Sequence, residues 1–484
     1  MNNIEVKDIK NNKNCIIDNK EDIIDNSKKF IELREKYTEF HYKSFNIAED
    51  SESINISYVF EISGLSHFEP QLKILKKDLN LKSINSNIVK NMVFSMGMVE
   101  LISYWKCACP KNVIIDCMNL NDEQINWWKK LYFYGLGELF YRNNIKVSID
   151  DFMSIKSASD ISYKNEVDAF KTDYNGYIVP IGGGKDSVVT LETLPLDRNN
   201  DYCLIINPKP VTLECARIAG FKSSNIIEIK RTIDKELIDL NNKGFINGHT
   251  PFSAMLAFVS YFISYLLGKK YIALSNENSA NESNVVGEKI NHQYSKSLEF
   301  ENDFEYYTNK YLKTGVKYFS FLRPLNELQI AKLFSKHKKY HQVFRSCNVG
   351  SKGKEWIWCC NCAKCLFAFT ILSPFLYKDE IVKIFNEDLF EKQSLLNTFI
   401  ELTGNGPYKP FDCVGTFDEV NYAISKTIQN IEKNNERLPF LLKYYKDNFN
   451  MYDTSNDITK QYNENTNLTK EQNEILKKEV FSND

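Results

Sequence analysis

The sequence predicts an α/β protein with a central parallel sheet, an α+β region before it and a helical segment with a cysteine cluster after it. Three observations support this prediction. Short apolar runs alternate with helical stretches between Tyr177 and Leu274. A glycine-rich loop follows the first of these runs. Five of the twelve cysteines lie between Cys347 and Cys365.

The bulk composition is that of a globular protein. The chain has 484 residues, which suggests two or three domains. A net charge of -2 gives no reason to expect nucleic acid or an anionic membrane as a general partner. The start of the chain lacks an apolar signal region, which indicates a cytoplasmic protein. The nineteen uncharged residues Thr250–Gly268 could form a membrane span, but their serines and tyrosines favour a buried helix.

Composition and patterning divide the chain into five predicted segments. The two ends are polar, and we expect a disordered leader and a mobile tail there. The predicted segments are the leader 1–28, an N-terminal α+β domain 29–170, an ATP-binding domain 171–345, a cysteine-cluster and helical region 346–445, and the tail 446–484.

The N-terminal domain is predicted to contain a β-hairpin and two helices. Apolar residues alternate from Phe40 to Phe60, with a turn at Glu49–Glu52. An apolar helix is expected over Asn87–Ser103, continuing to Trp105, and a second over Asp122–Tyr141.

The central domain is predicted to alternate strands with helices. The strands are expected at Tyr177–Ile181, Cys203–Ile206, Ile226–Ile229 and Tyr271–Leu274, and the helices at Val188–Leu194, Thr212–Ala219 and from Pro251 onward. Such alternation indicates a parallel sheet covered on both faces, which binds ligands at the carboxyl ends of its strands.

The glycine-rich loop is the strongest candidate for a phosphate site. Glycines allow backbone N–H groups to approach phosphate oxygens, and the next helix directs its positive end there. Lys185 would add a positive charge, Ser187 a donor, and Asp186 a carboxylate for Mg²⁺. The loop lacks the glycine spacing of a Walker A or dinucleotide motif. Its glycines are Gly182, Gly183 and Gly184.

The run Gly183–Ser187 resembles the Gly-Gly-x-Asp-Ser loop of the PP-loop ATPase superfamily. This resemblance implies ATP binding, cleavage between the α and β phosphates, and an adenylylated intermediate. It also places Asn207, after the second strand, near the adenine. The alternative is a glycine-rich turn that binds nothing.

The cysteine cluster has the spacing of a metal site. Cys359, Cys362 and Cys365 form C-x2-C-x2-C, and Cys347 lies twelve residues before Cys359. Four thiolates can enclose a tetrahedral Zn²⁺, so we expect structural zinc with Cys360 as the spare cysteine. The alternatives are a site that uses Cys360 with two other cysteines and a different fourth ligand, an iron–sulfur cluster, or reduced cysteines packed as small hydrophobes.

The order of phosphate loop and late cysteine cluster resembles the cyano-deazaguanine synthases, which are shorter and lack a counterpart of residues 1–170. An amide- or nitrile-forming enzyme is therefore one alternative function. A second alternative is a protein that binds ATP without catalysis.

Further segments resemble the bacterial UDP-N-acetylmuramoyl-L-alanyl-L-glutamate epimerases over about residues 40 to 430. The segments are Glu100–Lys106, Gly135–Tyr141, Gly248–Pro251, Ser279–Glu282, Asn291–Ser297, Glu299–Glu301, Arg323–Leu325, Ser346–Asn348 and Lys409–Thr416. The resemblance implies that a UDP-linked muramoyl dipeptide is the substrate and that its terminal L-glutamate is inverted with ATP and Mg²⁺ in peptidoglycan synthesis.

The implied chemistry explains the need for ATP. An acyl adenylate removes the carboxylate charge and acidifies the α-proton, which a base then removes before an acid returns a proton on the other face. The candidates for these two groups are His292, Lys296 and Cys413, beside the loop residues Lys185 and Asp186. The alternatives are a loop histidine, a lysine that binds an anion, and a cysteine that only packs.

Substrate contacts are expected where the later strands end. Glu277 and Glu282 could hold Mg²⁺ or cap a turn, and Arg323 could clamp a carboxylate or diphosphate or form a surface ion pair. The remaining candidates are Asn281, Asn291 and Tyr294. The sequence does not predict an oligomeric state.

Overall fold

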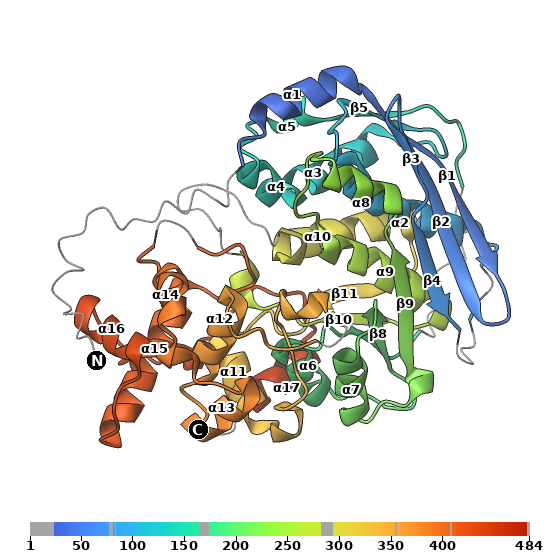
Figure 1. Ribbon diagram of the computed structural model, residues 1–484. Helices are drawn as coiled ribbons and strands as arrows, with labels where there is room; N and C mark the ends of the chain where they lie inside the picture. The colour runs from blue at the N-terminus through green and yellow to red at the C-terminus, as the bar shows by residue number, and fades with distance from the viewer. Residues whose placement is uncertain are drawn as a thin grey trace.

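The fold is that of a mixed α/β protein built on one large sheet (Figure 1). The computed structural model describes residues 24–76, 81–82, 84–163, 174–281, 294–353, 356–406 and 409–481. Most of the predicted leader 1–28 lies outside these residues. Within them, eleven strands form the sheet in the order β11-β10-β7-β8-β9-β4-β2-β1-β5-β6, with β3 paired to β2.

The strands of the N-terminal half are β1 (Glu39–Glu49), β2 (Ser53–Ile62), β3 (Ser66–Phe68), β4 (Gln71–Leu75), β5 (Asn112–Ile115) and β6 (Ser154–Ser157). Those of the central part are β7 (Tyr177–Pro180), β8 (Tyr202–Ile206), β9 (Ile226–Thr232), β10 (Tyr271–Leu274) and β11 (Lys317–Ser320). The predicted hairpin and the four predicted central strands are all present, and β10 has the predicted bounds.

The central strands are all parallel, as predicted, and they create a switch point at β7. The chain runs from β7 through β8 to β9 on one side, then returns to place β10 and β11 on the other side. A crevice opens outside the carboxyl ends of two strands at such a point, and ligands bind there in open α/β sheets. The glycine-rich loop after β7 and the segment after β10 therefore meet at this edge of the sheet.

The N-terminal hairpin extends this sheet. Strand β4 pairs antiparallel with β9, with Ile74 opposite Ile229, and β2 and β1 follow. One continuous sheet thus crosses the predicted boundary near residue 170. The predicted domain limits remain predictions.

Helices of the first two thirds of the chain are α1 (Ser27–Lys36), α2 (Asn87–Trp105), α3 (Asp122–Gly135), α4 (Gly137–Arg142), α5 (Ile149–Phe152), α6 (Lys185–Thr193), α7 (Pro210–Ile218), α8 (Lys235–Asn242), α9 (Phe252–Leu267) and α10 (Leu298–Tyr307). Later helices are α11 (Glu327–Lys336), α12 (Ala363–Leu372), α13 (Lys378–Phe385), α14 (Leu396–Leu402), α15 (Phe417–Lys433), α16 (Phe440–Asn448) and α17 (Lys470–Phe481).

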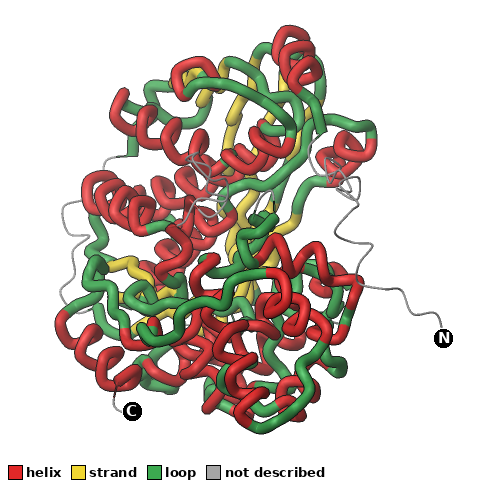
Figure 2. The backbone as a smooth tube through the Cα atoms, turned by 90° about the vertical axis from the view of Figure 1, so that its left-hand side faces the viewer, coloured by secondary structure: helices red, strands yellow, loops and turns green. Residues whose placement is uncertain are grey.

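Two cores lie on the two faces of the sheet, because neighbouring strand residues point in opposite directions. In β7, Ile178 joins the core around α2 and α9, whereas Val179 joins the core around α6, α11 and α12. The strands accordingly form a band through the molecule with helices on both sides (Figure 2).

The apolar segment Thr250–Gly268 forms the buried helix α9, as expected. It packs against α2, β7 and β10, and Gly268 ends it in a left-handed conformation. Among the described residues, no helix is both long enough and apolar enough to cross a bilayer.

Two elements differ from the sequence prediction. The single helix expected over Asp122–Tyr141 is divided at Leu136 into α3 and α4, and Pro251 packs directly on Gly135 at that point. The segment 446–481, expected to be a mobile tail, is folded. Its helix α17 packs against α6 and buries Leu476, because two apolar side chains one turn apart give a mostly polar segment a hydrophobic face.

Candidate active site at the switch point

The glycine-rich loop has the geometry that phosphate binding requires. Gly183 has a φ of +76°, and a Cβ there would lie 3.2 Å from the Thr212 side chain. Gly184 is the N-cap of α6. Gly182 is exposed and no heavy atom lies within 4 Å of its ideal Cβ position. The loop therefore presents an open backbone surface at the positive end of a helix.

The two charged residues of the loop are paired with each other. Lys185 is buried, and its Nζ contacts the carboxylates of Asp186 and Glu327. Burial lowers the pKa of Lys185, but the two carboxylates outweigh it and raise the pKa above its usual value. The Ser187 hydroxyl donates to the Gly184 carbonyl at 3.0 Å. Lys185, the first residue of α6, is therefore held as a charged group immediately after the glycines.

Two glutamates that were not predicted lie in this part of the site: Glu327 contacts Lys185, and Glu419 contacts Glu327. Glu327 begins α11, and its N–H donates to Glu419 Oε1 at 2.7 Å. The other Glu419 oxygen accepts the N–H of Thr416 in the capping box of α15. The pattern Thr416-x-x-Glu419 indicates the start of a helix in the sequence. Only the folded structure shows that this helix start lies next to the start of α11.

Burial raises the pKa of Glu327 well above its usual value. Lys185 lowers it, and the carboxylates of Asp186, Glu277 and Glu419 raise it further. Glu277 is buried immediately after β10, and Ser279 Oγ donates to it at 3.3 Å. Asp186, Glu277, Glu327 and Glu419 therefore interact electrostatically, but among the described residues they do not form a compact ligand group like the one that the four cysteines form.

Lys296 and Cys413 form a close pair, although 117 positions separate them in the sequence. The distance from Lys296 Nζ to Cys413 Sγ is 3.0 Å. Burial raises the pKa of the Cys413 thiol, but the charges of Lys296 and Lys364 overcome this and lower it to about 7. Burial also lowers the pKa of Lys296, whereas Cys413 and Glu277 raise it to a net value above the usual one. The pair is therefore an ammonium beside a sulfur that is about half ionised at pH 7.

Arg323 has a different position from the one expected of a substrate clamp. Its side chain is fully buried, and it donates to the carbonyl of Glu277 at 2.8 Å and to that of Lys296. The alternative of a surface ion pair is therefore wrong, whereas the expected role of Arg323 as a clamp for a carboxylate or diphosphate stays a prediction. Its side chain fixes the backbone of two candidate residues.

The side chains of Tyr294 and Asn207 also form hydrogen bonds within the protein. Tyr294 is buried against Tyr134, and its hydroxyl donates to Asp303 at 3.2 Å, so a substrate contact through this side chain is not supported. Asn207 follows β8 and has a φ of +52°, and its side-chain oxygen accepts the N–H of Arg231 at 2.8 Å. Its expected proximity to adenine stays a prediction.

Three predicted residues lie outside the described part of the chain. They are Glu282, Asn291 and His292. Of Asn281, the structure describes only the backbone, at the end of a 3-10 turn (Asn278–Asn281). The roles expected of these four residues remain predictions.

The predicted metal ligands come together in one cluster. The sulfur atoms of Cys347, Cys359, Cys362 and Cys365 all lie within 4.8 Å of one another. Three of the separations are 3.5, 3.7 and 3.8 Å. Ligands at about 2.3 Å from a tetrahedral Zn²⁺ would be about 3.8 Å apart, so the cluster fits a metal ion such as zinc.

The spare cysteine is the predicted one. Cys360 points away from the cluster, and its thiol donates to the Phe385 carbonyl at 3.2 Å. Its backbone has a φ of +54°, which turns the chain between the ligands on either side. The alternative ligand set that includes Cys360 is therefore wrong.

A short segment links this cluster to the rest of the site. We call Arg345–Asn348 the connecting segment. The Arg345 N–H donates to the Gly183 carbonyl at 2.9 Å, and Asn348 Nδ2 donates to Asp412 Oδ1 at 2.6 Å. Between them lies the cluster ligand Cys347. A metal ion bound by the cluster would thus fix the positions of the glycine-rich loop and of the loop that carries Cys413 relative to each other.

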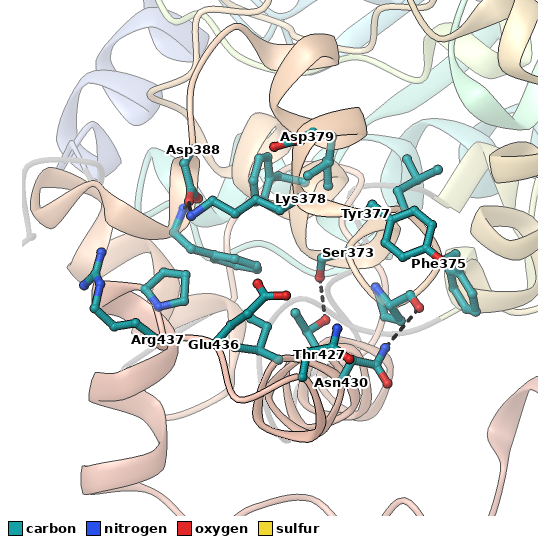
Figure 3. Close-up of a pocket in the computed structure, with 18 of the residues that line it drawn as sticks. Ser373, Phe375, Tyr377, Lys378, Asp379, Asp388, Thr427, Asn430, Glu436 and Arg437 are labelled. Carbon is teal, nitrogen blue, oxygen red and sulfur yellow. Dashed lines mark hydrogen bonds and ion pairs between the residues drawn. The ribbon is translucent and has the colours of Figure 1, made fainter.

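A hollow lies among the C-terminal helices, away from the predicted residues. Its volume is about 770 Å³, and it lies between the segment from Phe369 to Asp388 and the helix α15 (Figure 3). Its polar groups pair with each other: Ser373 with Thr427 at 2.7 Å and Lys378 with Asp388 at 3.0 Å. None of the candidate site residues lines it.

Comparisons with known proteins identify relatives along most of the chain. Residues 31–321 match the model of the MurL N-terminal domain, and residues 343–451 match that of the MurL C-terminal domain. Three curated proteins named UDP-N-acetyl-alpha-D-muramoyl-L-alanyl-L-glutamate epimerase are similar in sequence.

The protein of Salinispora tropica is 33% identical over 334 residues, which cover 68% of this chain and 71% of the relative. That of Xanthomonas oryzae pv. oryzae is 30% identical over 352 residues, covering 71% and 76%. That of a Micromonospora strain is 32% identical over 337 residues, covering 68% and 73%. These matches support the role of an epimerase enzyme.

Proposed function

Because the chain belongs to the MurL epimerase family, we propose that it inverts the terminal L-glutamate of UDP-N-acetylmuramoyl-L-alanyl-L-glutamate to D-glutamate. We further propose that the reaction consumes ATP, proceeds through an acyl adenylate and releases AMP and pyrophosphate in the cytoplasm. The observation that carries this proposal is the ion pair of Lys296 and Cys413, which can move protons, beside a loop suited to phosphate.

The glycine-rich loop and Lys185 would hold the phosphates of ATP. The backbone N–H groups after Gly182 and the positive end of α6 favour anions, and Lys185 is already charged. This strand–loop–helix arrangement supports the assignment of the parallel half to the PP-loop type. Mg²⁺, held by Asp186 with Glu277, would neutralise phosphate charge when bound.

The adenylate makes the proton transfer feasible. Removing the α-proton beside a free carboxylate would create a dianion, whereas an adenylated carboxyl group carries no such charge. A base can then remove the proton, and an acid can return one on the other face. Lys296, Cys413 and His292 are the proposed proton-transfer groups.

The cysteine cluster is proposed to hold a structural Zn²⁺. Its sulfur separations match a tetrahedral thiolate site, and a four-cysteine site leaves no position open for substrate. Its proposed role is to hold the connecting segment against the glycine-rich loop.

The test uses the full chain with the UDP-linked L-Ala-L-Glu substrate, ATP and Mg²⁺. We expect AMP and pyrophosphate by chromatography, and D-glutamate after hydrolysis of the product. Lys185→Met should slow AMP release roughly 10²–10³-fold, in the range for one lost charge-stabilising group. The surface variant Lys443→Met is the matched control.

Two outcomes would favour the alternatives. A product that forms only when ammonia is present would indicate an amide- or nitrile-forming enzyme. Binding of ATP with no release of AMP from any of these mixtures would indicate a protein that binds the nucleotide without catalysis.

A further inference from the structure

The contact between Lys296 and Cys413 constrains how the two groups can act. Inversion by two proton-transfer groups places one on each face of the α-carbon, each about 3 Å from it, so the groups lie about 6 Å apart. Lys296 Nζ and Cys413 Sγ are 3.0 Å apart. In this arrangement both groups approach the α-carbon of a substrate from the same side. One of them therefore cannot remove the proton from one face while the other returns a proton to the opposite face.

The charges around the pair favour a nucleophilic sulfur. Lys296 and Lys364 stabilise the thiolate of Cys413, and Asp186 is the opposing charge. With a pKa of about 7, roughly half of the sulfur is thiolate at neutral pH. Asp186, in the glycine-rich loop, acts electrostatically on both Cys413 and Lys296. Gly415, two residues after Cys413, packs against Glu327, which contacts Lys185 of the loop, so the sulfur lies near the place where the adenylate would form, and Cys413 is only half-buried.

We propose that Cys413 is an acyl acceptor: its thiolate attacks the carbonyl of the acyl adenylate and forms an enzyme-bound thioester of the substrate. This inference rests on the proposed function. The sulfur–carbon bond forms, the bond from that carbon to the AMP phosphate oxygen breaks, and AMP leaves with the electron pair. No proton is needed, because the attacking group is already a thiolate.

The thioester would change the state of Lys296. The bound sulfur no longer carries a negative charge, so Lys296 loses the strongest of the charges that raise its pKa, while its burial still lowers it. Lys296 releases a proton to solvent and can then take the α-proton of the thioester. Thioester carbonyls acidify the neighbouring C–H bond more than carboxylates do. The electron pair of the C–H bond moves into the enolate.

A second group returns a proton on the opposite face, and water completes the cycle. Water attacks the thioester carbonyl, the carbon–sulfur bond breaks, and the sulfur leaves as a thiolate. Of the two water protons, one leaves the product carboxyl group for solvent and the other returns to the second group, while Lys296 is an ammonium again after taking the α-proton. The sum is ATP, water and the L-glutamyl substrate converted to AMP, pyrophosphate and the D-glutamyl product.

The test is an acid-quenched time course of the full chain with the UDP-linked L-Ala-L-Glu substrate, ATP and Mg²⁺ in D₂O. Intact-protein mass spectrometry should show an adduct of the substrate minus water, and peptide mapping should place it on Cys413. Lys296→Met should form the adduct at least about tenfold more slowly at pH 7, because the thiolate loses its nearest positive charge, and the glutamate of its product should carry almost no α-deuterium, because the base is gone. Cys413→Ala should show no adduct, whereas Cys117→Ala, a buried cysteine outside the site, should keep it.

A second measurement does not depend on trapping the adduct. Cys413→Ala should still release about one pyrophosphate per chain, but its AMP release should fall, because the adenylate lacks its acceptor. Continued AMP release by Cys413→Ala at the wild-type rate would overturn the proposal that Cys413 forms a thioester. So would a wild-type enzyme that forms AMP and α-deuterated product with no adduct; the proposed function would then stand. A wild-type chain that forms no AMP would overturn the proposed function itself.

Discussion

The cysteine cluster and the single thiol of Cys413 show how neighbours decide what a sulfur atom can do. In the cluster, each sulfur has three other sulfurs within 4.8 Å, a closed arrangement suited to a metal ion. Cys413 instead has the ammonium of Lys296 at 3.0 Å and is close enough to Asp186 of the glycine-rich loop to be affected by its charge. The four clustered sulfurs are suited to stiffening the chain around a metal ion, whereas the sulfur beside an ammonium is suited to reacting as a thiolate.

The largest effect is expected from removing the reactive sulfur. Cys413→Ala should reduce α-deuteration of the substrate by roughly 10²–10⁴-fold, the range for a positioned proton-transfer group, and by more if the sulfur also accepts the acyl group. The measurement is the deuterium content of the glutamate after reaction in D₂O. A variant with near-normal deuteration would show that Cys413 only packs in its loop.

The second effect concerns the closed cluster. The purified chain should contain about one zinc ion, and Cys362→Ser should contain almost none, because three thiolates bind the ion poorly. Elemental analysis gives the zinc content, and thermal unfolding should start at a lower temperature in the variant. The control is Cys360→Ala, which removes a thiol that faces Phe385 rather than the cluster. Equal zinc loss in both variants would refute the assigned ligand set, and iron in the wild type would indicate an iron–sulfur cluster.

The third effect concerns the charge beside Cys413. Alkylation of Cys413 by iodoacetamide should increase with pH around a midpoint of about 7. Lys296→Met removes the nearest positive charge, so burial should move the midpoint upward and slow alkylation at pH 7 at least about tenfold. Peptide mass spectrometry follows Cys413 separately from the other cysteines. An unchanged midpoint would contradict the ion pair.

The smallest effect is expected from weakening the contact between the connecting segment and the loop that carries Cys413. Asn348→Ala removes the 2.6 Å hydrogen bond to Asp412 while leaving every cluster ligand in place. We expect the zinc content to stay the same and kcat to fall about 2–10-fold, in line with one hydrogen bond. If kcat is unchanged, the connecting segment does not position the Cys413 loop.

The sequence predicted those parts of the molecule that depend on local patterns. The alternation of strands and helices, the glycine-rich loop and the C-x2-C-x2-C run lie within short segments, and all of them take the expected form. The split between α3 and α4 was missed, because it depends on Pro251 packing against Gly135 from a distant segment.

The candidate site was less predictable, because its members come from distant parts of the chain. Lys185 and Glu327 are 142 positions apart, and no local pattern marks the glutamate as anything other than a helix start. The burial of Arg323 was not predicted, because its sequence context does not reveal that its side chain donates to backbone carbonyls inside the protein. Lys296 and Cys413 were both expected near the chemistry, but only the fold shows that they touch.

The most direct test of the central claim is the dependence of α-deuteration on ATP. The full chain is incubated in D₂O with Mg²⁺ and UDP-N-acetylmuramoyl-L-alanyl-L-glutamate, with and without ATP, and the glutamate is analysed by mass spectrometry. We expect α-deuterium and D-glutamate only when ATP is present, with at least one AMP released per product molecule. Deuterium incorporation at the same rate without ATP would contradict it, because the carboxylate would then need no activation.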